Sequence, residues 1–342
     1  MRRIFPAVFF MIFVFLVSCS TDVDLYAEGE ETPIVYGLLD AQADTTFIKI
    51  THALKPENSL LNAASDQFQN EYPEKLDVRL TEFCNGDSLR QIILDTITIH
   101  NKQEGLFYAP AQKLYYTTEP IHQNTSNKHY RYRLTIVFPD HTWVTEEDMV
   151  GADEFRVVSG TADFSGGYLD KAASYLLFLP ADKAGIYDIS MTFTFYECRT
   201  FTSDTVKRTI LWPVGSYYTT QLNHQMDAGA YKVYYGHDDL YDKLEEVLGD
   251  DTVVVPGLRR YITDYPITVT IQAGGEHLAL YRYYHSVSDD TFNGEGDITL
   301  MDGVLGVFST KKTITKRLRL GGTTVPELMY QTKWGFRVMG GH

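Results

Sequence analysis

The chain has 342 residues, of which 45 are acidic and 30 are Lys or Arg, so its formal net charge is −15 at neutral pH. Such a charge disfavours nucleic acid and anionic lipid surfaces as partners, because both require a face rich in Lys and Arg. No nucleic-acid partner is therefore expected. A length above about 300 residues exceeds the usual size of a single hydrophobic core, which predicts two domains.

The first predicted element is a signal peptide at residues 1–18. Two arginines precede an apolar run, Ile4–Val17, which is shorter than the roughly 20 residues of a membrane-spanning helix. The run ends in Leu-Val-Ser before Cys19, an ending that resembles the lipobox of bacterial lipoproteins. We expect cleavage before Cys19 and lipidation of its thiol, with an ordinary secretory signal as the alternative. The mature charge is then −17, because residues 1–18 carry two arginines and no acid.

Residues 19–31 are predicted to form a tether between the lipid and the fold. Several acyl chains on one cysteine anchor a protein without a spanning helix. The segment Ser20–Asp24 is acidic, and it resembles the export signal that sends Bacteroidota lipoproteins to the cell surface, although Val23 departs from that signal. We therefore expect a lipid-anchored protein of the outer membrane that faces the cell exterior.

Most of the remaining chain predicts β-structure. In Tyr130–Phe138, aromatic and apolar residues alternate with Arg131, Arg133 and Thr135, as in a sheet with one buried face. Similar short runs, rich in Val, Ile, Thr, Tyr and Phe, recur between turn residues. The predicted strands are Ile34–Leu39, Thr46–Thr51, Leu76–Phe83, Gln91–Ile99, Tyr130–Phe138, Thr142–Thr145, Tyr175–Leu179, Tyr187–Tyr196, Lys207–Trp212, Ala230–Tyr235, Ile267–Gln272, and Val304–Leu320 with one break.

The acidic stretch Glu146–Glu154 lacks apolar periodicity and is the predicted domain boundary. We expect an immunoglobulin-like β-sandwich over residues 32–150, followed by a larger β-rich domain over residues 151–342. The fold class is thus mostly β, with one helix covering a sheet.

That helix is predicted at His237–Gly249. From Leu240 onward, apolar residues recur at i, i+4, i+7 and i+8, which is typical of one buried helix face. Asp238 and Asp239 suit the positive N-terminal end, and the final glycine suits the position after a helix end. The segment Leu54–Phe68 allows a second short helix, which Pro56 disfavours.

Two cysteines, Cys84 and Cys198, remain in the mature chain. Two free thiols are expected, and a disulfide is the alternative in an oxidising compartment. The sequence contains no C-x-x-C, no H-E-x-x-H and no Cys/His cluster, so a zinc site has no support.

The best calcium candidate is the acidic, glycine-containing loop over residues 289–297. Hard cations prefer several oxygen ligands around a tight turn. Thr291 stands where an EF-hand loop has an acid, however, and Leu300 replaces its closing glutamate. A solvated turn is the preferred interpretation, and no cofactor is expected. The candidate ligands are Asp289, Asp290, Asn293 and Asp297.

The sequence lacks the common catalytic and phosphate-binding motifs. It contains no G-x-S-x-G, G-x-G-x-x-G or Walker pattern, and its ten histidines are scattered singly, so no enzyme is expected. Tyrosine clusters such as Tyr217-Tyr218 and Tyr281–Tyr284 suit interfaces and sugar-binding platforms. Adjacent tyrosines also arise in strands simply because alternate residues face in and out.

Several segments resemble a family of Bacteroidota outer-membrane lipoproteins of unknown function, whose genes often accompany TonB-dependent receptors. The resemblance implies an outer-membrane location and a receptor partner, and it implies no catalytic residue. The family motif Asn-Ile-x-Gly-Gly-Leu-Gly-x-Phe corresponds here to Leu300–Phe308, which keeps Gly303, Leu305, Gly306 and Phe308. The segments that carry the resemblance are Ile34–Leu39, Thr46–Ala53, Tyr130–Asp148, Tyr281–Ser286 and Ile298–Ser309.

Five Asp-Ser/Thr-x sites resemble the sites that Bacteroidota O-glycosylate on exported proteins. Their hydroxyl residues are Thr45, Ser88, Thr96, Thr205 and Thr252.

The expected function is therefore non-catalytic binding at the cell surface, as a ligand-capturing module or as an accessory subunit of a TonB-dependent receptor. The alternative is a structural, adhesive or motility-associated surface lipoprotein, which would assemble through an added strand. A hydrolase whose catalytic residues are distant in sequence is a third hypothesis.

Overall fold

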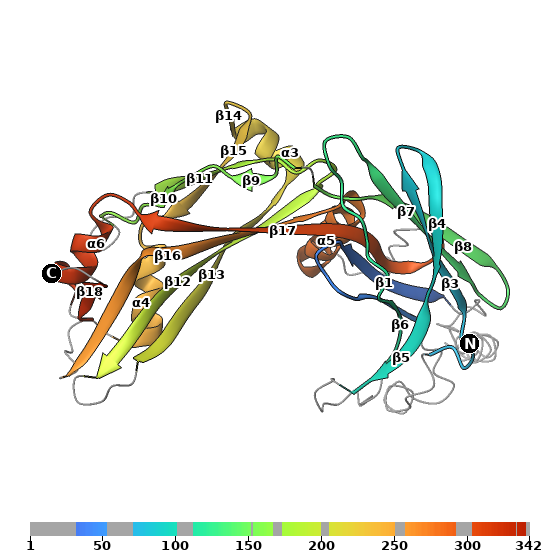
Figure 1. The fold of residues 1–342 in the computed structure, drawn as a ribbon, viewed down its shortest axis with the longest axis horizontal. Coiled ribbons are helices and arrows are strands. Elements are labelled where there is room, and N and C mark those ends of the chain that lie inside the picture. The colour runs from blue at the N-terminus through green and yellow to red at the C-terminus, as the bar shows by residue number, and fades with distance from the viewer. Residues whose placement is uncertain are drawn as a thin grey trace, which may run out of the picture.

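The computed structural model shows a mostly β protein, as the sequence predicts. It describes residues 32–52, 71–100, 112–151, 153–166, 173–199, 205–249, 257–291, 303–332 and 334–339, with side chains up to residue 285 in the range 257–291. Figure 1 shows two lobes that meet at a narrow waist. The immunoglobulin-like form of the N-terminal lobe stays a prediction.

The N-terminal lobe is a sandwich of two sheets. One is the β17-β1-β2-β6-β5 part of a ten-stranded sheet that continues into the C-terminal lobe, and the other has the order β4-β3-β7-β8. Their facing sides enclose a core that includes Val35, Ile48, Leu80 and Leu134. The strands are β1 (Pro33–Asp40), β2 (Thr46–His52), β3 (Asp77–Cys84), β4 (Asp87–Ile93), β5 (Asp95–Ile99), β6 (Gln112–Thr117), β7 (Tyr130–Val137) and β8 (Thr142–Asp148).

The C-terminal lobe has long strands in the order β13-β12-β16-β17 and a smaller sheet in the order β14-β15-β11-β9, with β10 paired to β17 and β18 paired to β16. Both sheets contribute to a second core, which includes Phe178, Phe193 and Val233. The strands are β9 (Arg156–Val157), β10 (Thr161–Ala162), β11 (Ala173–Leu179), β12 (Ile186–Arg199), β13 (Thr205–Tyr218), β14 (Met226–Asp227), β15 (Ala230–Gly236), β16 (Leu258–Gly274), β17 (Leu305–Leu320) and β18 (Phe336–Val338).

Strand β17 belongs to both lobes. Its first half pairs in parallel with β1, from Leu305 to Lys311, and its second half pairs antiparallel with β16, from Lys311 to Leu318. Close packing against β1 requires Gly306, because a Cβ there would lie 2.1 Å from the carbonyl oxygen of Val35. The single strand therefore runs through the waist, as Figure 1 shows.

The domain boundary at residue 150 stays a prediction, and the two cores meet close to it along the chain. Met149 belongs to the N-terminal core and Val150 belongs to the C-terminal core. The N-terminal core also contains Val304 and Phe308 from β17, which lie far beyond that boundary. The predicted break within Val304–Leu320 is absent, since the pairing partner changes there while the strand continues.

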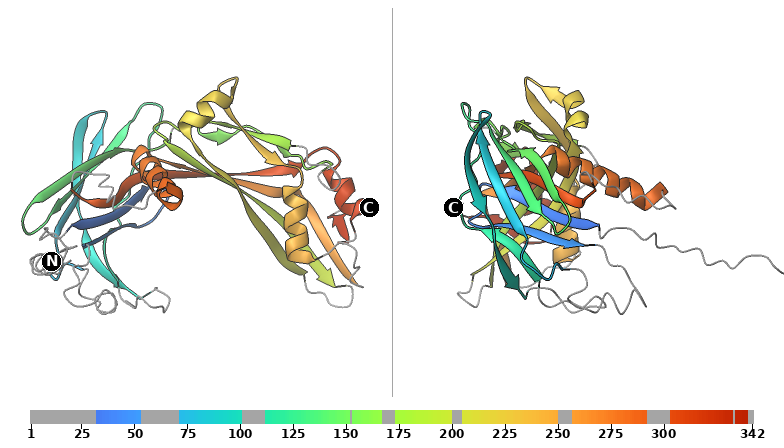
Figure 2. Two further views of the ribbon diagram at one scale, coloured as in Figure 1. Left: turned by 180° about the vertical axis from the view of Figure 1, so that it is seen from behind. Right: turned by 90° about the vertical axis from the view of Figure 1, so that its right-hand side faces the viewer.

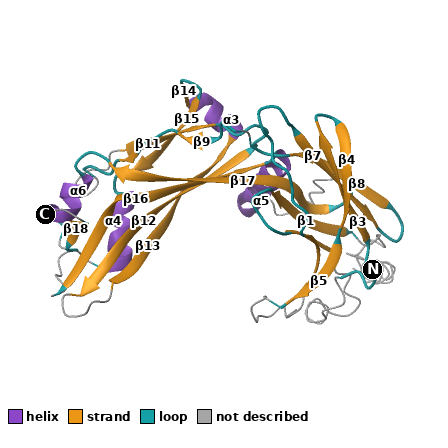
Figure 3. Ribbon diagram, in the orientation of Figure 1, coloured by secondary structure: helices purple, strands orange, loops and turns teal. Residues whose placement is uncertain are grey.

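The helices lie at the waist and in the C-terminal lobe (Figure 3). The predicted covering helix is confirmed as α4, which ends before Gly249, and it buries Leu240 and Leu244 but leaves Val247 57 % exposed. The second helix predicted at Leu54–Phe68 lies outside the described residues, because residues 53–70 are not described. The helices are α3 (Thr219–Leu222), η1 (Asn223–Gln225), α4 (Asp239–Leu248), α5 (Glu276–Thr291), α6 (Thr324–Pro326) and η2 (Glu327–Gln331).

Helix α5 is not predicted from the sequence. It starts at the waist and projects from the same side of the molecule as the start of β1 (Figure 2). In the part of the chain that the structure describes, no helix combines the length and the apolar character needed to cross a membrane.

Candidate functional site

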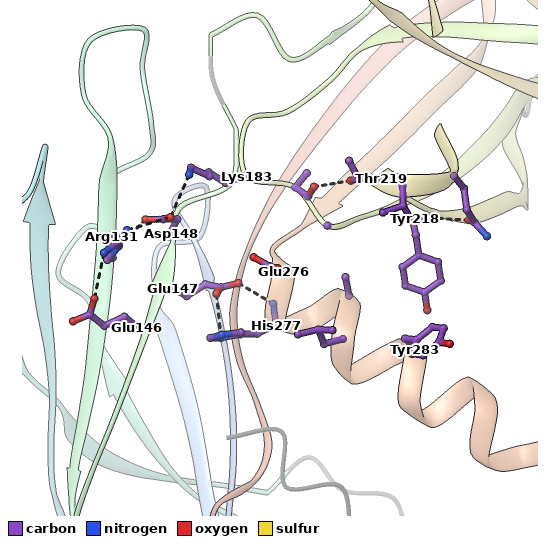
Figure 4. A pocket seen from close by; sticks show the side chains of 16 residues that line it. Arg131, Glu146, Glu147, Asp148, Lys183, Tyr218, Thr219, Glu276, His277 and Tyr283 are labelled. Atoms are coloured by element: carbon purple, nitrogen blue, oxygen red, sulfur yellow. Dashed lines mark hydrogen bonds and ion pairs between the residues drawn. The ribbon is translucent and has the colours of Figure 1, made fainter. Parts of the chain in front are cut away.

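A cavity of about 840 Å³ lies at the waist. Its lining comes from the start of β7, the end of β8, the turn over residues 180–185 between β11 and β12, the end of β13 with α3, and the first two turns of α5. Figure 4 shows charged side chains at one end and two tyrosines at the other. Both lobes therefore contribute to one hollow, which is a common location for ligand sites.

The charged end is a group of four residues from both lobes. Arg131 Nε donates to Asp148 Oδ1 at 2.8 Å, and its Nη1 lies 3.5 Å from Glu146 Oε2. Lys183 Nζ, from the C-terminal lobe, lies 3.6 Å from Asp148 Oδ2. Burial alone would raise the pKa of Asp148, but the hydrogen bond from Arg131 and the two positive charges hold that pKa below its ordinary value. Asp148 is therefore ionised at neutral pH and links the two lobes.

Lys183 has a backbone conformation that a lysine rarely adopts. Its φ angle is +59°, in the left-handed region, where a residue with a Cβ is strained by about 1–3 kcal/mol. The residue lies in the turn that faces the cavity, and its side chain is 53 % exposed. A glycine would relieve the strain, so we interpret the lysine as a residue placed for its side chain.

The floor of the cavity contains a buried carboxylate, Glu147, which is only 7 % exposed. Its Oε1 accepts from the Ser309 hydroxyl at 2.7 Å and from the His277 backbone N–H at 3.3 Å. Its Oε2 lies 3.0 Å from His277 Nδ1. Burial raises the pKa of Glu147, and the histidine and the hydroxyl oppose this rise only in part.

A close backbone approach makes this arrangement possible. A Cβ at Gly275 would lie 2.3 Å from Glu147 Oε1 and 2.7 Å from Ser309 Oγ, so only glycine fits directly before α5. The Leu278 N–H also donates to Ser309 Oγ at 3.2 Å. The first turn of α5 is thus fixed to β8 and β17 by polar contacts that satisfy its free N–H groups.

These residues do not form a serine–histidine–acid relay. Ser309 contacts the carboxylate of Glu147, and His277 Nδ1 lies 3.0 Å from that carboxylate and 3.1 Å from the carbonyl oxygen of Phe308. Two acceptors around Nδ1 imply that this nitrogen carries the proton. A nucleophilic serine would instead need to contact the histidine, so the contacts are those of a structural junction.

The opposite end of the cavity is aromatic and apolar. The rings of Tyr218 and Tyr283 are nearly perpendicular, at 83°, with centroids 6.1 Å apart. Tyr283 is 52 % exposed and Leu280, one turn earlier on α5, is 43 % exposed. The start of α3 is held in place because Thr219 donates its N–H to Gly185 O at 2.9 Å. The cavity therefore has a polar wall and an aromatic wall.

A second hollow of about 660 Å³ adjoins the charged end on the outer face of the N-terminal sandwich. Both hollows share the four-residue charged group. Phe83 lies under the guanidinium of Arg133, 4.8 Å from its ring centroid, and His129 lies 3.8 Å from Asp182 across the lobes. The charged group therefore lies between the two hollows and lines both of them.

The residues predicted from sequence lie elsewhere. Cys19 and the tether are outside the described residues. Asp289 and Asp290 fall in the last turn of α5 rather than in a loop, whereas Asn293 and Asp297 are not described. Within the described ranges, no three His, Cys, Asp or Glu side chains are placed to hold a metal ion. The calcium loop stays a prediction.

The other predicted positions are on the surface or partly buried. Ser88 and Thr205 are exposed at the starts of β4 and β13, Thr45 and Thr96 are half-buried, and Thr252 is not described. Cys84 and Cys198 are free thiols in different lobes, as expected.

Sequence reasoning found the tyrosines of the cavity but not its polar residues. Tyr218 and Tyr283 belong to the tyrosine clusters that the sequence suggested for an interface or sugar platform. Glu147, in contrast, was assigned to a boundary segment, and His277 was one of many isolated histidines. A local signal for these polar residues is the pair Gly274-Gly275 shortly before His277, because adjacent glycines indicate a close approach of the backbone.

Comparison with known proteins gives no identification. No protein-family model matches the chain, and no curated protein matches it.

Proposed function

We propose that this protein is a lipid-anchored lipoprotein of the outer-membrane surface that binds a small ligand, without chemical conversion, in the cavity at the waist. The observation that carries the proposal is the cavity itself. Its volume of about 840 Å³ falls within the about 300–1,000 Å³ typical of small-molecule sites. It is formed by both lobes and combines fixed polar groups with an aromatic wall.

The position of the predicted anchor supports this proposal. A tether of residues 19–31 would reach at most about 45 Å if fully extended. It leads to β1, which starts on the side of the waist where α5 projects (Figure 2). A membrane-anchored protein would thus hold its cavity near the membrane, where a TonB-dependent receptor could take over the ligand. The receptor partner rests on the family resemblance alone.

The adhesive alternative would use an open sheet edge. Among the described strands, β13 is the longest edge strand, with 14 residues. It carries Lys207, Arg208 and Pro213, and its pairing with β12 contains a bulge at Ile189–Ser190. Charged residues, proline and bulges all discourage further strand pairing. These features favour ligand binding over strand-mediated assembly.

The binding proposal can be tested by blocking the cavity. Leu280→Trp fills the aromatic end, and Leu211→Trp is the matched control, because Leu211 is 65 % exposed on β13 outside the cavity. Small-molecule fractions of the growth medium are screened for an increase in Tm. We expect an active fraction to raise the Tm of the wild type and of Leu211→Trp, but not of Leu280→Trp. Equal shifts in all three proteins would contradict the proposal.

The anchor is tested separately. An alkyne analogue of palmitate should label the wild-type protein and not Cys19→Ser. Labelling of both proteins, or of neither, would contradict lipidation at Cys19.

A further inference from the structure

The charges of the cavity indicate what kind of ligand it excludes. At its charged end, Arg131 and Lys183 face Glu146 and Asp148, so the formal charges of these four residues cancel. An anionic ligand would compete with Asp148 for the two cations, and a cationic ligand would compete with Arg131 for the two carboxylates. Burying a charge without a partner is costly. Two further carboxylates line the cavity: Glu147, which is paired with His277 and Ser309, and Glu276, which is exposed to solvent. The cavity therefore favours a neutral ligand over an anionic one.

The same groups nevertheless leave hydrogen-bonding positions open to a ligand. Lys183 has three N–H donors, and Asp148 lies near only one side of it. Gln221 uses its Oε1 to accept the Tyr218 N–H at 3.0 Å, which leaves its amide N–H groups as donors. The exposed carboxylate of Glu276 provides acceptors. The cavity thus offers both donors and acceptors, and a hydroxyl group, which both donates and accepts, can pair with either.

The aromatic wall adds a different requirement. The half-exposed Tyr283 lies opposite the charged end (Figure 4), and Leu280, one turn earlier on α5, adds apolar surface to the same cavity. Aromatic side chains gain most from an apolar partner that covers the ring. A wholly apolar ligand would cover this wall but would also remove water from the charged group without replacing its hydrogen bonds. The fitting ligand has one C–H face and one edge of hydroxyl groups.

We infer that the ligand is a neutral sugar, with its C–H face on Tyr283 and its hydroxyl groups towards Lys183, Gln221 and Glu276. This inference rests on the proposed function, because it names the ligand class of the same cavity. It adds that Tyr283 contributes through its ring and that the charged group contributes through hydrogen bonds rather than through net charge.

The test uses the full lipidated chain in a detergent without a sugar headgroup. Saturation-transfer NMR and titration calorimetry compare three neutral trisaccharides (cellotriose, mannotriose and xylotriose) with trigalacturonic acid and the peptide Gly-Tyr-Gly. We expect a neutral trisaccharide to bind, with saturation strongest at its ring C–H protons. Tyr283→Ala should weaken binding at least about tenfold, whereas Tyr283→Phe should keep it. Tyr234→Ala is the matched control, since Tyr234 is equally exposed, at 52 %, on β15.

The outcomes separate this inference from the proposed function. Binding of trigalacturonic acid or of Gly-Tyr-Gly, lost in Tyr283→Ala while no neutral sugar binds, would overturn the sugar inference and leave the cavity as a ligand site. Equal loss in Tyr283→Ala and Tyr234→Ala would also overturn it. If no compound of the panel binds, the inference fails, and the Tm screen with Leu280→Trp decides the proposed function independently.

Discussion

Each lobe buries a glutamate side chain, and so does the waist. The glutamates of the lobes differ from that of the waist in how fully hydrogen-bond donors compensate for burial. In the N-terminal lobe, Glu82 accepts from the Tyr132 hydroxyl at 2.5 Å and from Arg90 Nη2 at 2.9 Å. In the C-terminal lobe, Glu327 accepts from the Tyr241 hydroxyl at 2.7 Å. Burial raises the pKa of both carboxyls, but these donors outweigh burial and hold both pKa values below the ordinary range.

At the waist, hydrogen-bond donors compensate less completely for the burial of Glu147. Burial outweighs the donors around Glu147, so its pKa is raised. A perturbed ionisable group beside a cavity is more typical of a functional region than of a lobe interior. The comparison teaches that hydrogen-bond donors outweigh burial around the glutamates of the lobes, whereas burial outweighs the donors around the glutamate next to the cavity.

The largest loss of stability is expected from Glu82→Ala. This change removes the acceptor of the buried Tyr132 hydroxyl and the buried partner of Arg90, and each hydrogen bond to a charged group contributes about 1.5–3 kcal/mol. Urea denaturation at pH 7 measures the loss. The matched control is Glu119→Ala, because Glu119 also pairs with Arg90, at 3.0 Å, but is 54 % exposed, and exposed pairs contribute at most about 1 kcal/mol. A loss of unfolding free energy below about 1 kcal/mol for Glu82→Ala would contradict the difference between buried and exposed glutamates.

A smaller effect is expected from removal of the tyrosine hydroxyls. Tyr132→Phe and Tyr241→Phe each delete a hydrogen bond to a carboxylate, which contributes about 1.5–3 kcal/mol. Tyr132→Phe also removes the acceptor of the His122 backbone N–H, at 2.8 Å, and both variants should lose more stability than an exposed tyrosine control. Chemical denaturation of both variants and of the exposed control Tyr234→Phe tests this order. A control as damaging as either variant would contradict it.

The pH dependence of stability should distinguish the waist from the lobes. A carboxyl whose pKa is raised on folding binds its proton more tightly in the folded state, so the free energy of unfolding increases as the pH falls from 7 towards the ordinary glutamate pKa of about 4.3. Glu147 should contribute such an increase. Glu82 and Glu327 have lowered pKa values, so their stabilisation is lost only when the pH falls below that ordinary value.

Glu147→Gln should remove the waist contribution while keeping the shape of the side chain. We expect the difference in urea midpoint between pH 7 and pH 5 to be smaller in this variant than in the wild type. Glu146→Gln, at the neighbouring position on β8, is the control that should retain the wild-type difference. If the difference in urea midpoint between pH 7 and pH 5 were the same in Glu147→Gln as in the wild type, the pH dependence would come from another group and the prediction would be wrong.

The smallest effect on stability is expected at Lys183. Lys183→Gly relieves its left-handed backbone conformation and should raise the free energy of unfolding by up to about 1 kcal/mol, while weakening ligand binding. Ala228→Gly is the control, because Ala228 has a φ of +48° in the turn between β14 and β15. This control should stabilise the fold and leave binding unchanged. Weaker binding in both variants would contradict a role for the lysine side chain.

Sequence patterns predicted the fold class because alternation is a local property. Tyr130–Val137 alternates as expected, and α4 follows its apolar stripe. Helix α5 is not predicted because its start is fixed by contacts with Glu147 and Ser309 that no local pattern reveals. Strand β16 is longer than predicted, since Asp264-Tyr265-Pro266 is typical of a turn.

The cavity itself was beyond prediction from one sequence. Glu147 lies 130 residues from His277 and 162 residues from Ser309, and a chain with 45 acidic residues offers many equivalent pairs. The change of partner along β17 brings these segments together, and it depends on the pairing of whole strands. Only the tyrosines carried a local signal, through their clustering.

Native mass spectrometry tests the central claim most directly. Wild type, Leu280→Trp and Leu211→Trp are purified from outer membranes in mild detergent and compared by intact mass. The account predicts an additional non-covalent mass on the wild type and on Leu211→Trp that is absent from Leu280→Trp. The same bound mass on all three proteins, or on none of them, would contradict a ligand site at the waist.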